Sequence, residues 1–151
     1  MKRDNKRRSV ALTICILTAS FGIAWVPPLP ARGEVVAIAN RDVTVDRLSP
    51  QEVKNIFLGK TTHWSNGQRI IPTLQDQGKV HQEFLNSSMG MTAVAFRNYW
   101  RKVIFTGEGA SPRTVQSDAE MIHMVASTPG AVGYVDNQSN PQGVNVFRII
   151  H

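Results

Sequence analysis

The histidines and serines are the side chains of this sequence that could carry catalytic or metal chemistry. No two of His63, His81 and His123 stand four residues apart, the spacing that places two metal ligands on one helix face, and H-E-x-x-H is absent. No serine lies in G-x-S-x-G, and the single cysteine, Cys15, lies near the N-terminus. The spacing therefore predicts no metal, no cofactor and no enzymatic activity.

A second motif that could do chemistry is Gly59-Lys60-Thr61, which ends a nucleotide phosphate loop when it follows G-x-x-x-x. Here Lys54 occupies the position of the first glycine. The residues before Gly59 predict a helix that ends there, whereas a phosphate loop needs a strand that leads in and a helix that follows. Nucleotide binding is therefore excluded, and Gly59 is predicted to end a helix in the left-handed conformation.

The segment 74–81, LQDQGKVH, is the best candidate for a ligand loop because it joins a predicted strand to a predicted helix. Ligands of open α/β sheets bind at the carboxyl ends of strands, and a helix N-terminus there offers free N–H donors to an anion. Gln77, Gly78 and Lys79 would supply donors and one positive charge. The simpler alternative is an ordinary turn with Asp76 as the N-cap.

A basic cluster lies further along the chain. Arg97, Arg101, Lys102 and Arg113 could form an anion-attracting patch or a docking surface for a membrane partner. Arginine and lysine at i, i+4 more often form a solvated helix face, and Glu108 offsets part of the charge.

The N-terminal 33 residues have the order of a secretory signal peptide: a basic start, an apolar run from Val10, and small residues at Ala31 and Gly33. They hold 6 of the 17 Lys and Arg and one of the 11 Asp and Glu, so residues 34–151 carry a net charge of only +1. This charge gives no support to nucleic-acid binding. We expect a disulfide-free domain over residues 34–151, located in a bacterial periplasm.

Hydrophobic periodicity and capping signals predict an α/β domain with a mixed sheet flanked by helices. Strands are expected at 34–40, 69–75, 131–135 and 144–150, and helices at 50–58, 78–85, 92–105 and 117–128. Ser49 with Glu52, and Ser117 with Glu120, are predicted to form capping boxes. Pro72 is expected to place its strand at a sheet edge or to end the strand early. In the helix over 92–105 the inward residues are expected to be Phe96, Tyr99, Trp100, Val103 and Ile104.

Two segments resemble the periplasmic phosphate-binding proteins of ABC uptake systems. Residues 48–64, LSPQEVKNIFLGKTTHW, are similar to the family stretch L-S-x-x-E-x-x-x-I-F-x-G-K-x-x-x-W. Residues 127–135, STPGAVGYV, are similar to x-T-P-G-A-I-G-Y-V and follow in the family's order. The resemblance covers roughly residues 34–136 and implies one lobe of a type II periplasmic-binding-protein fold, as in short members given the same label.

The resemblance also implies a phosphate or oxyanion ligand, an inner-membrane permease as partner, and a role in ABC-type uptake. The family's phosphate loop reads like R-x-D-G-S-G-T, and its Arg, Ser and Thr positions fall on Gln75, Lys79 and His81. His81 thus joins Gln77, Gly78 and Lys79 as an expected anion-binding residue. The alternative is a periplasmic interaction or sensory module that docks on a membrane partner, and a second copy of the chain is a further candidate partner.

Overall fold

The computed structural model describes residues 33–45, 47–147 and 149. The signal peptide expected over residues 1–33 lies outside the described residues, apart from Gly33. The elements follow in the order β1 (Val35–Ala39), α1 (Pro50–Phe57), β2 (Ile71–Gln75), α2 (Lys79–Met89), α3 (Ala93–Phe105), β3 (Arg113–Val115), α4 (Asp118–Ser127), β4 (Ala131–Asp136), a 3₁₀ turn at Asn137–Ser139, and β5 (Asn145–Phe147). No helix in these ranges is both long and apolar enough to cross a membrane.

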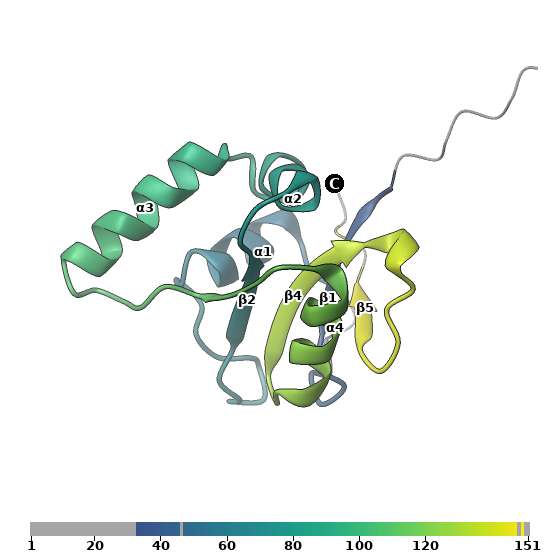
Figure 1. The fold of residues 1–151 in the computed structure, drawn as a ribbon. Helices are drawn as coiled ribbons and strands as arrows, with labels where there is room; N and C mark the ends of the chain where they lie inside the picture. The colour runs from purple at the N-terminus through teal and green to yellow at the C-terminus, as the bar shows by residue number, and fades with distance from the viewer. Residues whose placement is uncertain (1–32, 46, 148, 150–151) are drawn as a thin grey trace, which may run out of the picture. The chain divides into compact units, whose positions relative to one another are not determined.

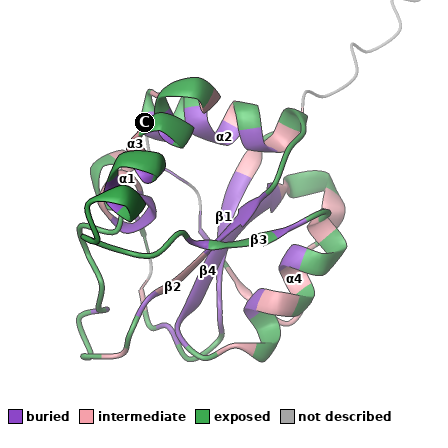
Figure 2. Ribbon diagram, turned by 60° about the vertical axis from the view of Figure 1, so that its left-hand side comes forward, coloured by how far each residue is buried: buried purple, intermediate pink, exposed green. Residues whose placement is uncertain are grey.

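The strands form one mixed sheet in the order β3-β2-β4-β1-β5, which confirms the predicted α/β class. β2 runs parallel to β3 and β4, whereas β1 runs antiparallel to β4 and β5. The helices α1, α2 and α3 contribute to the hydrophobic cluster on one face of the sheet, and α4 packs on the other face (Figure 1). The central strands are buried on both faces (Figure 2).

The starts of α1 and α4 and the end of α1 follow the signals read from the sequence, whereas α2 continues to Met89, beyond its expected end at residue 85. Ser49 and Glu52 form the predicted capping box of α1, and Gly59 follows the helix at φ +71°, the left-handed stop that was expected. Ser117 caps α4, but Glu120 accepts its return bond from the N–H of Gln116, at 2.8 Å, and not from that of Ser117. The prediction of both helix starts is confirmed.

The prediction that Pro72 places its strand at a sheet edge or ends it early is wrong, because β2 lies between β3 and β4 and continues past Pro72 to Gln75. The N–H of Ile71 faces β4 and donates to the carbonyl of Gly130 at 3.1 Å. The ring nitrogen of Pro72 therefore faces the other side, where β3 pairs only from Thr73 onward. The proline removes no ladder bond, and the three-residue strand β3 was too short for the sequence pattern to reveal.

Helix α3 buries a narrower face than its sequence suggests. Phe96, Trp100 and Val103 are buried as predicted, and Tyr99 is partly buried with its hydroxyl donating to the carbonyl of Leu58 at 2.8 Å. Ile104 was expected to point inward, but it is 51% exposed. The error arises because the helix contacts the domain along one narrow stripe, and Ile104, four residues after Trp100, lies at the edge of that stripe.

Candidate functional site

The carboxyl end of β2 leads directly into the N-terminus of α2, as the sequence predicted for a ligand loop. The N-cap is Gly78, at φ +116° and ψ 176°, and no side chain caps the helix. The alternative with Asp76 as the N-cap is therefore wrong. The backbone of Gly78 lies in a region that only glycine adopts readily, whereas α1, α3 and α4 each begin with a Ser or Thr side-chain cap.

The first bond within α2 runs from the N–H of Gln82 to the carbonyl of Gly78, at 3.1 Å. The N–H groups of the preceding helical positions have no partner in the helix and carry its partial positive charge. A hollow of about 380 Å³ lies at this end of the helix, where Gly78 and His81 border it and Lys79 and Val80 do not. Its walls are Asp76, Gln77, Gly78, His81, Gln82, Ala93 and Arg97.

His81 is the buried polar side chain of this hollow, with 8% of its surface exposed. Its Nδ1 lies 2.6 Å from the hydroxyl oxygen of Tyr134, which also accepts the N–H of Gln75 at 2.9 Å. The hydroxyl has one proton to donate, and His81 is the acceptor that the structure offers it. The imidazole then carries its proton on Nε2, an atom with no hydrogen bond to any described residue.

The electrostatics of the site favour a neutral imidazole. Burial lowers the pKa of His81, and the positive charge of Arg97 lowers it further, against an opposing effect of Asp76. Burial also raises the pKa of Tyr134 far above its ordinary value, so its hydroxyl stays protonated. His81 thus carries an N–H donor on Nε2 and borders the hollow, with the ring of Tyr134 stacked beside the imidazole and the ring of Phe96 edge-on to it.

The structure brings three of the four expected site residues to the same hollow: Gln77, Gly78 and His81. Lys79, the next residue after Gly78, does not border this hollow; it borders a neighbouring surface hollow with Gln82 and other residues of α2. Arg97 takes the place of the expected cation, because α3 carries it to the rim of the hollow. The sequence offered Arg97 only as one member of a basic helix face.

The position aligned with the family's phosphate-loop arginine is used for another purpose. The side-chain amide of Gln75 donates to a carboxylate oxygen of Asp118, at the start of α4. The other oxygen of Asp118 accepts the N–H of Asp136, at 3.1 Å, and the hydroxyl of Ser139. Gln75 therefore links β2 to α4 and the end of β4.

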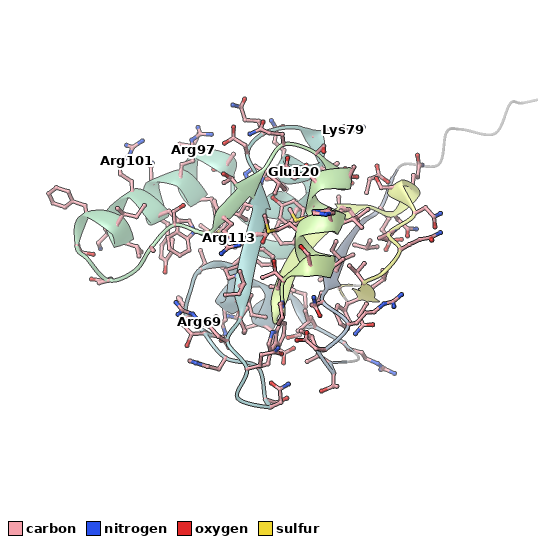
Figure 3. The ribbon with its side chains drawn as sticks, turned by 60° about the horizontal axis from the view of Figure 1, so that its bottom comes forward. Arg69, Lys79, Arg97, Arg101, Arg113 and Glu120 are labelled. Atoms are coloured by element: carbon pink, nitrogen blue, oxygen red, sulfur yellow. The ribbon has the colours of Figure 1, made fainter. Side chains whose placement is uncertain are left out.

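The predicted basic patch is divided. Arg97 and Arg101 lie next to each other on α3, whereas Arg113 lies apart on β3 (Figure 3). A guanidinium nitrogen of Arg113 points to the sulfur of Met124 on α4, at 3.8 Å. Both α3 arginines border a second hollow, which Lys102 does not reach. Across the described residues, no three His, Cys, Asp or Glu side chains gather as metal ligands would.

The indole of Trp100 lies on the inner side of α3 and lines this second hollow. Its Nε1–H is buried and has no hydrogen-bond partner among the described residues. The terminal ring atoms face Gly59, where an added Cβ would come within 3.1 Å of them. Gly59 therefore also provides room for Trp100, in addition to ending α1.

Comparison with known proteins identifies the fold. The chain is similar to an ABC-type phosphate transport receptor from Vibrio cholerae, at 18% identity and a TM-score of 0.59, over 78% of this chain and 46% of that one. A Clostridium perfringens structure described as a phosphate ABC transporter substrate-binding protein with bound phosphate is 16% identical, with a TM-score of 0.62, and the match covers 78% of this chain and 45% of that one. The PstS structure from Borrelia burgdorferi is 16% identical, with a TM-score of 0.54, and the match covers 78% of this chain and 47% of that one.

No protein-family model and no curated protein sequence matches the chain. The chain spans about half the length of the solved structures it matches. The expected resemblance is confirmed for the fold, which is that of one part of these larger proteins.

Proposed function

We propose that the chain binds a phosphate-like oxyanion at the hollow in front of α2. The observation that carries this proposal is a hollow at the start of α2, a helix that no side chain caps, bordered by Gly78, by a buried histidine and by an arginine. Free backbone donors, a helix dipole and a guanidinium together favour a negatively charged ligand over a neutral or cationic one.

Each residue has a definite role in this proposal. Gly78 supplies the backbone conformation that leaves the first N–H groups of α2 open to the ligand. His81 donates from Nε2, and its orientation is set by Tyr134. Arg97 supplies the charge, and Gln77 supplies an amide. Lys79 adds only a positive charge outside the hollow.

The likeness to substrate-binding proteins of phosphate transporters supports a role in ABC-type uptake, with an inner-membrane permease as the partner, over a sensory or docking module. The predicted signal peptide supports export to the periplasm. Fractionation of cells that express the full chain tests this directly. The mature protein is expected in the periplasmic fraction, shortened by about 33 residues.

Titration calorimetry with phosphate, sulfate and small carboxylates tests the binding proposal. Saturable heat is expected with phosphate or sulfate at millimolar concentrations or below. Arg97→Gln is expected to weaken binding about fivefold, or roughly 1 kcal/mol, as for a charge at the rim of a site. Lys102→Gln is the matched control, since it removes an equal charge from the same helix outside both hollows.

Lys79→Gln separates this geometry from the one read from the sequence. We expect it to change the affinity much less than Arg97→Gln, because Lys79 borders a different part of the surface. Absence of saturable heat with every anion would overturn the proposed function. Equal losses for Arg97→Gln and Lys102→Gln would show that only the overall charge matters.

A further inference from the structure

A second hollow of about 370 Å³ adjoins the proposed oxyanion site and shares three of its residues, Asp76, His81 and Arg97. It lies between α3 and the carboxyl ends of β2 and β3. Its remaining walls are Leu74, Gln75, Phe96, Trp100, Arg101, Ile104, Ser111 and Thr114. A ligand held by His81 and Arg97 can therefore extend from one hollow into the other.

The two hollows differ in chemistry. The second has an apolar floor made by Leu74, Phe96 and Trp100, which are all buried, and Ile104 stands at its rim half exposed. A flat apolar group can pack against the aromatic rings of Phe96 and Trp100 in this floor. The first hollow has none of the apolar floor residues and is bordered mainly by polar groups.

The first hollow is also poorly suited to a free tetrahedral oxyanion as its complete ligand. No serine or threonine hydroxyl borders it, and the carboxylate of Asp76 does. A free phosphate has four oxygens to satisfy, whereas a phosphonate has three, since a carbon replaces the fourth. A ligand whose fourth substituent on phosphorus extends into the apolar hollow needs fewer hydrogen-bond donors from the first hollow.

We propose that the preferred ligand is an organic oxyanion, a phosphonate- or phosphate-type head group that bears a small aromatic or apolar group. This inference rests on the proposed function for its head group and adds the class of the substituent. The head group binds at the start of α2, next to His81 and Arg97. The substituent packs on Phe96 and Trp100, under the rim formed by Ile104.

Calorimetric titration with phenylphosphonate, methylphosphonate and inorganic phosphate tests this proposal. Phenylphosphonate is expected to bind roughly tenfold more tightly than the other two, which corresponds to about 1.4 kcal/mol. Such a factor is reasonable for a ring that is partly removed from water against an apolar wall. The comparison with methylphosphonate keeps the head group constant.

Ile104→Ser locates the effect, and its half-exposed side chain can be replaced without disturbing the fold. We expect this change to reduce the ratio of the phenylphosphonate to the methylphosphonate affinity severalfold. Val94→Ser is the matched control, because Val94 is a similarly exposed β-branched residue of α3, 57% exposed, and borders neither hollow. It is expected to leave the ratio unchanged.

The outcomes separate the two proposals. Equal affinity for phosphate and phenylphosphonate would overturn the organic ligand and leave the oxyanion function standing. Tighter phenylphosphonate binding that Ile104→Ser does not alter would also overturn it, since the ring would lie elsewhere. Failure of all three anions to bind would overturn the proposed function and this inference with it.

Discussion

The hydroxyl of Tyr134 fixes the geometry of the site from within the core. Its ring stacks on Phe84 with the centroids 3.8 Å apart, and its oxygen bonds both the N–H of Gln75 and the imidazole of His81. Tyr134→Phe keeps the ring but leaves two buried polar groups unpaired. We expect the free energy of unfolding, measured in urea, to fall by about 1–3 kcal/mol.

Tyr99→Phe is the control for this prediction. Tyr99→Phe also removes a single hydroxyl that donates one hydrogen bond, but the side chain of Tyr99 is only partly buried. The expected loss is about 0.5–1.5 kcal/mol. A smaller loss for Tyr134→Phe than for Tyr99→Phe would contradict the role given to Tyr134.

His81 makes the stability depend on pH in a predictable direction. Its pKa is lowered in the folded protein by burial and by Arg97, so the unfolded chain takes up the proton first as the pH falls. The stability from the neutral imidazole is complete above the unfolded pKa of about 6.5 and decreases as the pH falls from there toward the lower folded pKa. His81→Gln is expected to remove this part of the slope.

Urea unfolding between about pH 8 and pH 5 measures that slope, which for one histidine is at most about 1.4 kcal/mol per pH unit. The range stops there because the pKa of Glu52 is also lowered, by its hydrogen bonds to Ser49, and its contribution is lost only below about pH 4.5. His123→Gln, on the exposed side of α4, controls for the loss of a histidine. An identical slope in His81→Gln and the unsubstituted protein would contradict the prediction.

Individual residues of the site were only partly predictable. Gln77 and Gly78 could be placed because they are local to one strand-to-helix connection, and His81 was expected from the resemblance to the family's phosphate loop. Arg97 comes to them through the packing of α3, a tertiary contact that no local spacing encodes. Tyr134 was visible only as part of a strand, where alternation assigns a face but not the partner of the hydroxyl.

Among the elements, α2 offers a direct test of why its N-terminus is open. It has a glycine at each end, Gly78 at φ +116° and Gly90 at φ +59°, and a Cβ at either would meet no atom within 4 Å. Alanine at Gly90 would adopt an ordinary left-handed conformation, at a cost of about 1 kcal/mol. Alanine at Gly78 would enter a region that is essentially restricted to glycine, and the cost is expected to be about 2–3 kcal/mol.

The measurement is urea unfolding of both variants, with anion titration alongside. Gly78→Ala is expected to lose more stability than Gly90→Ala and to weaken anion binding, because relief of the strain moves the first N–H groups of α2. Gly90→Ala is expected to leave binding unchanged. If the two substitutions cost the same, the conformation of Gly78 is not what keeps this helix end open.

The sequence located most elements but not their neighbours. Capping boxes and glycine stops are local, so the starts of α1 and α4 and the end of α1 could be read directly. The position of β2 inside the sheet could not be predicted from the sequence, because the rule that places proline at a sheet edge assumes partner strands along the whole strand. The two partners of β2 are offset, and this offset belongs to the sheet as a whole.

At the scale of the molecule, one sheet carries two hydrophobic clusters, and the larger one joins α3 to the rest of the domain. Trp64 and Trp100 both belong to it, although Trp64 precedes β2 and Trp100 lies on α3. Trp64 is also tied to the start of β4, since its Nε1–H donates to the carbonyl of Gly130 at 3.0 Å. Both hollows depend on this arrangement because α3 forms one wall of each.

We therefore expect α3 to unfold together with the sheet. In variants that retain only Trp64 or only Trp100, the fluorescence midpoint in urea should equal the midpoint from far-UV circular dichroism of the same variant, as for a two-state domain. Comparison within each variant removes the effect of the substitutions themselves. A Trp100 midpoint below the dichroism midpoint would instead make α3 a separate unit, and the site would then form only when this helix docks.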